Sequence, residues 1–307
     1  MKVLIATEKP FSKVAVEGIQ KIVEGAGHEF AKLEKYTSAD QLLAAVADAD
    51  ALIVRSDKVT RDVVAAAKNL KIVVRAGAGF DNLDLAALSE RKIVAMNTPG
   101  QNSNAVAELA ICLMIYISRN QLTPGTGSEL KGKTLGIQAY GNVGRLVANH
   151  AKGFGMNIMA YDPFVPAEAM EKEGVTVAKT LEDLYANSNF VSLHIPATEQ
   201  TKGSIGYNLV SRMPKGGCLV NTARKEVINE PELMKVLEDR EDLKYIADVA
   251  PACIDELKAK FGNRVFATPK KMGAETAEAN VNAGLAAANQ IVKFFTEGCT
   301  KFQVNKF

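Results

Sequence analysis

The sequence predicts an α/β protein made of two βα domains with parallel sheets and a cleft between them. Its 307 residues suggest two domains, because one domain usually has roughly 100–200 residues. From the N-terminus, short β-branched apolar runs alternate with helical patterns, which is typical of a parallel sheet covered by helices. A second series of the same kind begins after Lys133 and contains a glycine turn. Together these observations favour two α/β domains over one.

The first series contains four clear strands, in residues 3–6, 51–54, 71–74 and 92–96. Between them, the Ala- and Leu-rich residues 39–47 and 60–67 have helical spacing. Residues 97–100 (NTPG) break the pattern, a long apolar helix is predicted over residues 104–118, and residues 123–127 (TPGTG) indicate a flexible connection. We expect the chain to cross between domains around these two breaks, with the boundary after Thr98.

The second series predicts six strands, within residues 134–140, 157–162, 190–196, 218–223, 244–250 and 264–269. Helical or loop sequence separates each strand from the next, as in the first series. A final Ala-rich helix is predicted over residues 276–296. Its sequence is compatible with packing on either domain.

Charge and composition exclude several classes of function. Thirty-seven basic and thirty-five acidic residues give a net charge of +2, without the basic clusters that nucleic acid requires, so any anionic partner should be small. No segment approaches the ~20 apolar residues of a membrane span, and the N-terminal apolar run is too short for a signal peptide. The four cysteines are far apart, so we expect no metal site, no disulfide framework and a cytoplasmic location.

A nucleotide site is predicted where residues 135–145 (LGIQAYGNVGR) pass from a strand through a turn into a helix. Free N–H groups at a helix N-terminus favour a pyrophosphate, and Gly141 and Gly144 fit the last two glycines of the G-x-G-x-x-G fingerprint. Ala139 replaces the first glycine, at a cost on the order of 1 kcal/mol if its φ is positive.

Asp162 ends the following strand about 20 residues later, where a carboxylate accepts hydrogen bonds from a ribose. Its charge would repel a 2′-phosphate, so the pattern favours NAD over NADP and indicates a Rossmann-like domain. The alternative is a tight turn in which Asp162 only precedes Pro163.

Further motifs follow in order along the chain: residues 74–82 (VRAGAGFDN), 97–99 (NTP), 106–108 (VAE), 153–156 (GFGM), 161–163 (YDP), 194–196 (HIP) and 221–224 (NTAR). This series resembles the D-2-hydroxyacid dehydrogenase family over nearly the whole chain. The resemblance implies two Rossmann-like domains, NAD as cofactor and a homodimer. It also implies a discontinuous substrate-binding domain of residues 1–98 plus 276–307, and an NAD-binding domain of residues 99–275.

The resemblance also assigns site residues. Those expected to bind the cofactor are Gly141, Asn142, Val143, Gly144, Asp162, Pro196, Thr201, Thr222, Ala223 and Asp248. Those expected to bind the substrate are Arg55, Ser56, Ala76, Gly77, Ala78 and Arg224. Physically, the Gly77 loop can expose successive N–H groups to a carboxylate, and Arg224 can grip a carboxylate and carbonyl together. His194 receives no chemical role, because the family uses its segment for cofactor packing.

Residues 54–60 (VRSDKVT) resemble family members that act on 3-phosphoglycerate. Arg55 is therefore expected to bind a substrate phosphate, while Lys58 either adds charge or is simply solvated. The expected reaction is NAD-dependent oxidation of D-3-phosphoglycerate to 3-phosphohydroxypyruvate and its reverse, the first step of phosphorylated serine biosynthesis. Another D-2-hydroxy acid, such as glycerate or lactate, and a non-catalytic NAD(H) sensor remain alternatives. Because the sequence ends at Phe307, we expect no regulatory domain.

Two departures from the family pattern concern catalysis. Residues 268–274 (TPKKMGA) carry lysine where the family has its acid/base histidine, and counting back from Gly273 favours Lys271 over Lys270. Cys253 stands where the family has the glutamate that pairs with the histidine, and Asp255 or Glu256 is a possible substitute. We expect Arg224 and Lys271 to be catalytic, with Lys270 as the other candidate for proton transfer.

In this hypothesis, neutral Lys271 removes the hydroxyl proton as hydride leaves C2, and its ammonium returns the proton in the reverse reaction. An ordinary lysine pKa of ~10.4 makes the oxidation slow at neutral pH unless Lys270 and Arg224 lower that pKa. The sequence therefore predicts that alkaline pH favours oxidation of the hydroxy acid.

Overall fold

The computed structural model describes all residues from Met1 to Phe307. Unit 1 comprises Met1–Asn102 and Glu275–Phe307, and unit 2 comprises Ser103–Ala274. The TPGTG segment at residues 123–127 lies inside unit 2, not at the crossing, because the long helix before it packs into the core of unit 2. The predicted α/β fold with two parallel sheets is confirmed.

Unit 1 is built on a five-stranded parallel sheet with the strand order β2-β1-β3-β4-β5. Its strands are β1 (Lys2–Thr7), β2 (Glu29–Glu34), β3 (Ala51–Val54), β4 (Ile72–Arg75) and β5 (Val94–Asn97). Four of them were predicted. The sequence analysis missed β2, because this edge strand has the sequence EFAKLE and no fully buried residue, so it lacks the apolar run of a central strand.

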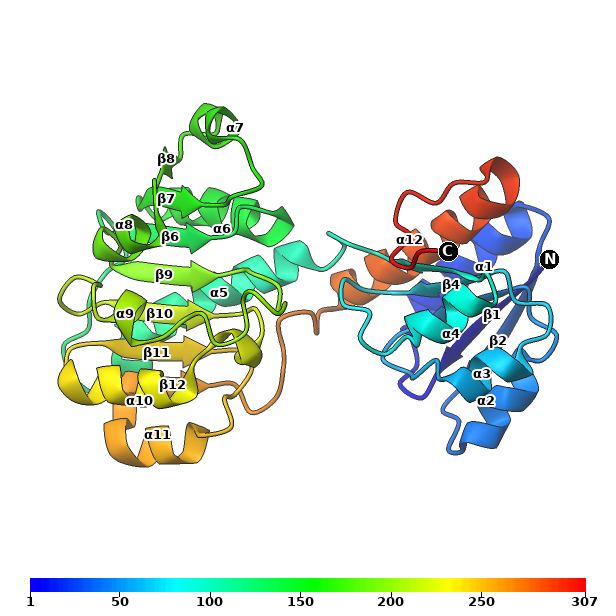
Figure 1. Cartoon of the computed structure of the whole chain (residues 1–307), viewed down its shortest axis with the longest axis horizontal. Helices are drawn as coiled ribbons and strands as arrows, with labels where there is room; N and C mark the ends of the chain where they lie inside the picture. The colour runs from blue at the N-terminus through cyan, green and yellow to red at the C-terminus, as the bar shows by residue number, and fades with distance from the viewer. The chain divides into compact units, whose positions relative to one another are not determined.

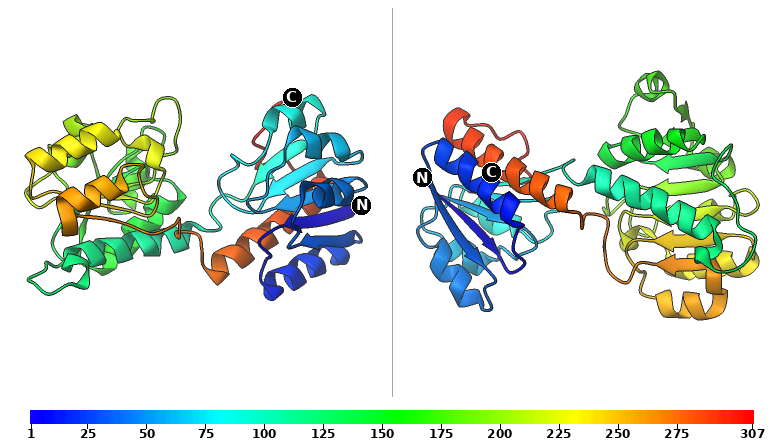
Figure 2. Two further views of the ribbon diagram at one scale, coloured as in Figure 1. Left: turned by 90° about the horizontal axis from the view of Figure 1, so that it is seen from below. Right: turned by 180° about the vertical axis from the view of Figure 1, so that it is seen from behind.

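Helices cover both faces of the unit 1 sheet (Figure 1). One face packs against α1 (Lys13–Gly25) and α12 (Ala277–Glu297), and the other against α2 (Ala39–Val46), α3 (Arg61–Ala66) and α4 (Leu85–Glu90). Figure 2 shows α12 beside α1. Gly18 and Gly284 allow this approach, since a Cβ at Gly18 would lie 2.5 Å from Leu285 and one at Gly284 would lie 2.9 Å from Ile19. The final helix therefore belongs to unit 1.

Unit 2 is built on a seven-stranded parallel sheet with the order β12-β11-β10-β9-β6-β7-β8. Its strands are β6 (Thr134–Gln138), β7 (Asn157–Tyr161), β8 (Thr176–Val177), β9 (Phe190–Leu193), β10 (Cys218–Asn221), β11 (Lys244–Ala247) and β12 (Val265–Ala267). The two-residue strand β8 was not predicted, because so short an edge strand leaves no periodic pattern.

Helices also cover both faces of the unit 2 sheet. One core contains α5 (Ser103–Ser118), α6 (Asn142–Gly153) and α7 (Ala167–Lys172), and the other contains α8 (Leu181–Ala186), α9 (Tyr207–Val210), α10 (Glu230–Asp239) and α11 (Ile254–Phe261). Short 3-10 turns are η1 (Asn120–Leu122), η2 (Lys225–Val227) and η3 (Gly262–Arg264). None of the helices has the combination of length and apolar character that crossing a membrane requires.

Each sheet has one point where the strand order reverses. In unit 1 the chain goes from β1 outward to β2 and returns to β3 on the other side of β1. In unit 2 it goes from β6 outward through β7 and returns to β9. Ligands of open parallel sheets bind beyond the carboxyl ends of the strands at such reversals. Arg55 directly follows β3, and the glycine turn directly follows β6, so both predicted binding regions lie at these points.

Candidate active site

The two glycines of the glycine turn, Gly141 and Gly144, have different surroundings. Gly141 is the N-cap of α6, and a Cβ added there would meet no atom within 4 Å. A Cβ added at Gly144 would instead strike the Ala139 carbonyl oxygen and lie 3.0 Å from Ile137 Cγ2. Gly144 thus lets α6 pack on β6, whereas Gly141 borders open space at a helix N-terminus. Asn142 and Val143 begin that helix, and no side chain caps it.

Ala139 adopts φ 78°, in the left-handed region that favours glycine. We therefore expect Ala139→Gly to raise the free energy of unfolding by roughly 0.5–1 kcal/mol, because relief of about 1–2 kcal/mol of strain outweighs about 0.4–1 kcal/mol of added chain entropy. Thermal and urea denaturation of the two proteins would measure the difference. Ala169→Gly, within helix α7, should have the opposite sign. A destabilised Ala139→Gly variant would contradict the assignment of strain.

Asp162 lies beside the glycine turn and helps to shape it. Its Oδ2 accepts a hydrogen bond from the Tyr140 N–H at 2.7 Å, and its Oδ1 accepts one from the Phe164 N–H at 2.8 Å. A carboxylate has about four acceptor positions, so two remain for ribose hydroxyls. The open space at Gly141 and the carboxylate next to it fit a dinucleotide at this end of the sheet.

The segments after β9 and β10 contribute two buried polar atoms without hydrogen-bond partners, Thr222 Oγ1 and His194 Nε2. Burial lowers the pKa of His194 to about 3, so its imidazole is neutral at neutral pH and has no acid/base role. Thr201 uses its hydroxyl locally, donating to the Pro196 carbonyl at 2.5 Å and accepting from the Thr198 N–H at 2.7 Å. Thr201 thus folds the loop that carries Pro196, while Thr222 Oγ1 and His194 Nε2 have no hydrogen-bond partner within the protein.

Arg224 follows β10 in a turn that Asn221 holds in place. The Asn221 side chain donates to the Arg224 carbonyl and accepts from the Ala223 N–H, both at 3.0 Å. The Arg224 guanidinium makes a single hydrogen bond, a 3.2 Å donation to the Ala223 carbonyl, and no carboxylate pairs with it. Most donors of the Arg224 guanidinium therefore have no acceptor within the chain.

Asp248 is 1% exposed and organises the loop of the two candidate lysines. Its Oδ1 accepts from Met272 N–H at 2.8 Å and from the Thr268 hydroxyl at 3.0 Å, while Oδ2 accepts from Gly273 N–H at 2.8 Å. These three bonds hold both ends of the loop. We interpret Asp248 mainly as a positioning residue, whereas the sequence analysis assigned it only to the cofactor.

Lys270 and Lys271 are both exposed within this loop. Because the Gly273 N–H is anchored on Asp248, the position two residues before Gly273 is set by the fold. The choice of Lys271 over Lys270, made by counting back from Gly273, stays a prediction. The Lys270 carbonyl lies 2.8 Å from the Thr268 hydroxyl, as an alternative to Asp248 Oδ1 for the single hydroxyl proton.

The carboxylate nearest Cys253 in the hydrogen-bond network is Glu230, which the sequence analysis did not identify. Glu230 accepts from the N–H groups of Ala252 at 2.8 Å and Cys253 at 3.0 Å. Burial and the Glu230 carboxylate raise the pKa of the Cys253 thiol to about 11, so it stays protonated at neutral pH. Asp255 and Glu256, the predicted substitutes, are exposed in the first turn of α11. No motif marks Glu230, because its partners are backbone groups more than 20 residues away.

In unit 1, the guanidinium of Arg55 is held in place by neutral acceptors, while its backbone N–H donates to Asp57 Oδ2 at 3.3 Å. Its Nη1 donates to the carbonyls of Lys9 and Pro10, both at 3.1 Å, and its Nη2 donates to Asn280 Oδ1 at 2.5 Å. The guanidinium lies 5.4 Å from the centre of the Phe11 ring. Neutral acceptors orient Arg55 but leave its positive charge uncompensated. Ser56, the next residue, is exposed.

The Gly77 loop differs in detail from the prediction of successive free N–H groups. The Ala76 N–H donates to the Val54 carbonyl at 2.8 Å and the Gly77 N–H donates to the Arg75 carbonyl at 2.9 Å, so neither N–H group is free for a ligand. Gly77 has φ 148°, and a Cβ there would overlap the Arg75 guanidinium.

Arg75 is a second residue that the sequence analysis left without a role. It ends β4, and its Nε donates to the Arg55 carbonyl at 2.9 Å. Its position at the end of a strand, two residues before Gly77, could have indicated from the sequence that Arg75 belongs to the same edge of the sheet. The carboxyl edge of the unit 1 sheet therefore carries two neighbouring arginines, Arg55 and Arg75.

Comparison with known proteins agrees with this geometry. Residues 116–269 match the model of the D-isomer specific 2-hydroxyacid dehydrogenase NAD-binding domain. The chain is 37% identical to D-3-phosphoglycerate dehydrogenase of Methanocaldococcus jannaschii over 89% of its own length and 54% of that protein's. It is 38% identical to hydroxypyruvate reductase of Thermotoga maritima over 84% of its length and 89% of that protein's.

Among solved structures, NAD+-bound 3-phosphoglycerate dehydrogenase of Entamoeba histolytica is 50% identical to the chain. It superimposes with a TM-score of 0.89, over 100% of this chain and 99% of that one. The chain spans about half the length of the M. jannaschii relative. The matched NAD-binding domain and the nearly full-length match to hydroxypyruvate reductase establish that the chain belongs to the D-isomer specific 2-hydroxyacid dehydrogenase family.

Proposed function

We propose that the chain catalyses the NAD-dependent interconversion of D-3-phosphoglycerate and 3-phosphohydroxypyruvate. The observation that carries this proposal is the uncompensated Arg55 guanidinium at the strand reversal of unit 1. A dianionic phosphate matches such a charge better than the hydroxymethyl group of glycerate or the methyl group of lactate would. The relatives named 3-phosphoglycerate dehydrogenase support the same substrate.

The NAD-binding residues proposed for unit 2 are Gly141, Asn142, Val143 and Gly144 at the pyrophosphate, Asp162 at the ribose, and Pro196, Thr201, Thr222 and Ala223 further along the edge. Bound NAD supplies a hydride acceptor for the substrate carbon C2. Unit 1 is proposed to bind the substrate through Arg55, Ser56 and the Ala76–Ala78 segment, with the free N–H of Ala78 facing its carboxylate. We propose that unit 1 is the substrate-binding domain and that unit 2 is the NAD-binding domain.

Three residues of unit 2 are proposed to orient the substrate, to transfer the proton and to position the proton-transfer loop. Arg224, with free donors, holds the carboxylate and the C2 oxygen in a fixed orientation. Lys271 is proposed to take the proton from the C2 hydroxyl during oxidation and to return it during reduction. Asp248 keeps the Lys271 loop in register through its bonds to residues 272 and 273. This assignment predicts that oxidation becomes faster as the pH rises, because only the neutral amine accepts a proton.

The most direct test is to follow NADH consumption by the purified chain with 3-phosphohydroxypyruvate. We expect turnover with this substrate and much less with hydroxypyruvate or pyruvate. A protein that binds NADH but reduces none of the three would support the NAD(H) sensor instead. Turnover with pyruvate or hydroxypyruvate alone would support another D-2-hydroxy acid.

Arg55→Ala tests the phosphate preference. We expect it to raise the KM for 3-phosphohydroxypyruvate by roughly 10- to 100-fold, the equivalent of one or two charge-assisted hydrogen bonds. The KM for hydroxypyruvate, which lacks the phosphate, should change little. Lys58→Ala removes a neighbouring exposed charge and serves as the control. Equal effects of Arg55→Ala on both substrates would contradict a phosphate contact.

We also propose that the protein is a cytoplasmic homodimer that supplies serine biosynthesis. The family resemblance supports the dimer, and the absence of a helix suited to a membrane agrees with the location. Light scattering should give twice the chain mass of 32.9 kDa. A mass of one chain at micromolar concentration would exclude the dimer.

A further inference from the structure

Unit 2 contains a cavity of about 250 Å³ at the edge of its sheet opposite the glycine turn. Residues at the amino ends of four strands line it, namely Lys133 before β6, Asn189 before β9, Cys218 in β10 and Lys244 in β11. Ser118, the last residue of α5, completes the wall. Gly141 and Arg224 follow the carboxyl ends of β6 and β10. The cavity is therefore separate from the candidate active site.

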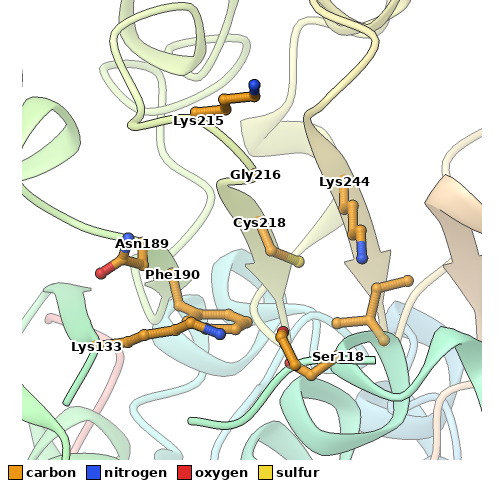
Figure 3. Close-up of a pocket in the computed structure, with 10 residues that line it drawn as sticks. Ser118, Lys133, Asn189, Phe190, Lys215, Gly216, Cys218 and Lys244 are labelled. Carbon is orange, nitrogen blue, oxygen red and sulfur yellow. The ribbon is translucent and has the colours of Figure 1, made fainter. Parts of the chain in front are cut away.

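The lining of this cavity is positively charged. Figure 3 shows Lys133 and Lys244 extending toward the same space, while Lys215 points away from it. No Asp or Glu lines the cavity. Burial and the charge of Lys244 lower the pKa of the Lys133 ammonium, which reflects the closeness of two like charges in a partly buried place. No ion pair is formed by either lysine.

The acidic groups near the cavity do not cancel this charge. Asp242 accepts from the Gly216 N–H at 2.8 Å and pairs with Arg240, also at 2.8 Å. Glu129 is exposed, and Lys133 donates to its backbone carbonyl, while the Glu129 carboxylate attracts the ammonium without forming an ion pair. The positive charge of the cavity is thus left for a ligand.

A buried hydroxyl also lacks a partner at this place. Ser118 is 4% exposed, and its Oγ makes no hydrogen bond. Its carbonyl, at the C-terminal end of α5, already accepts from the Ser128 N–H at 2.8 Å. Asn189 uses its Oδ1 to accept from the Thr134 N–H at 2.9 Å, which leaves its amide N–H groups as donors. Because a buried hydroxyl without a partner is costly, Ser118 Oγ is a donor in the cavity wall that an added acceptor would satisfy.

We propose that this cavity binds a small oxyanion of the phosphate type. Lys133 and Lys244 supply the charge, and Ser118 and Asn189 supply neutral donors. A site made of donors selects an acceptor with several oxygens, which excludes a metal cation. The ligand is inorganic phosphate or the phosphoryl group of a small metabolite, since both present the same oxygens. Cys218 adds an apolar wall, because burial raises the pKa of its thiol to about 12 and keeps it protonated.

Calorimetric titration of the whole chain with inorganic phosphate, in a chloride buffer, tests the proposal. The double variant K133M/K244M keeps the aliphatic stems but removes both charges. We expect it to raise the Kd for phosphate by roughly 10- to 100-fold. Lys293→Met, which removes one exposed charge from α12, should leave that Kd unchanged.

Phosphate can also enter the candidate active site, so Arg55→Ala and Gly141→Ala are titrated in parallel. Binding that persists in these two variants but is lost in K133M/K244M supports the cavity. Binding lost in Arg55→Ala or Gly141→Ala and kept in K133M/K244M overturns the proposal, as does an absence of phosphate binding in the unmodified chain. A parallel titration with glycerol 2-phosphate distinguishes a phosphomonoester ligand from free phosphate, and binding of either one supports the site.

Ser118→Ala gives an independent measurement. Without phosphate, the variant should be at least as stable as the unmodified chain, because it loses an unpaired buried hydroxyl. With phosphate, its gain in Tm should be smaller. A lower Tm without phosphate together with an unchanged gain would overturn the role of Ser118. Dissociation of a dimer by K133M/K244M would assign the lysines to a carboxylate of a second copy and would also overturn the proposal.

Discussion

Lys271→Ala is expected to lower kcat with 3-phosphohydroxypyruvate by roughly 10²- to 10⁴-fold, the usual contribution of a positioned proton donor. The affinity for NADH should stay close to that of the unmodified chain, because the proposed cofactor residues lie on other segments of unit 2. Stopped-flow turnover and NADH fluorescence titration would separate the two effects. Near-normal turnover would remove Lys271 from the mechanism.

Two further variants make the Lys271 prediction specific. Lys270→Ala removes the adjacent charge and should retain most of kcat, because counting back from Gly273 assigns the role of the family's histidine to Lys271. A loss confined to Lys270→Ala would reverse the assignment. Lys271→His should move the pH dependence of oxidation toward neutral pH, because an ordinary histidine has a pKa of ~6.5 against ~10.4 for lysine. A purely structural role for Lys271 would leave the pH profile in place.

Gly141→Ala is expected to weaken NAD binding by roughly 10- to 100-fold without lowering Tm. A methyl group there meets no protein atom within 4 Å, and φ −84° is open to alanine, so the fold tolerates the change. The same methyl group would occupy the space proposed for the pyrophosphate, and overpacking of this kind costs about 1–3 kcal/mol. Calorimetric titration with NAD+ and thermal denaturation measure the two quantities.

Gly144→Ala is the matched control for the glycine turn. Its methyl group would strike the Ala139 carbonyl and crowd Ile137, so its loss of NAD binding should accompany a lower Tm. The contrast between the two variants separates contact with the cofactor from packing of the helix. If Gly141→Ala binds NAD+ as tightly as the unmodified chain, the pyrophosphate does not lie at this turn.

Local patterns in the sequence were sufficient for the fold class and for most elements. Continuous apolar runs identify strands buried on both faces, which is why β3 coincides with its predicted limits. The edge strand β2 was missed, because charged residues that face solvent break such runs. The final helix could be predicted, but its domain could not. Its place depends on the contact of Gly284 with Ile19, more than 260 residues earlier.

The candidate site divides in the same way. The sequence alone was enough to propose Gly141, Asp162, Arg224 and Arg55, because each stands at a recognisable position at the end of a strand or in a turn. The sequence also predicted the replacement of the family's histidine by lysine. Ala139 was marked as a possible site of strain, and only its φ of 78° decided that the strain is present.

The sequence by itself determined that this is an α/β protein of a dehydrogenase family, with a glycine turn between a strand and a helix and two lysines where the family has a histidine. Only the tertiary structure decided that Gly77 uses its N–H internally, that Glu230 lies at Cys253 and that Asp248 anchors Gly273. It also brought Ser118 and Lys244 to one cavity. The physical reason is that motifs and periodicity depend on residues close together in the chain, and so they report on a single strand, turn or helix. Hydrogen bonds between distant segments depend on which strands the fold places side by side.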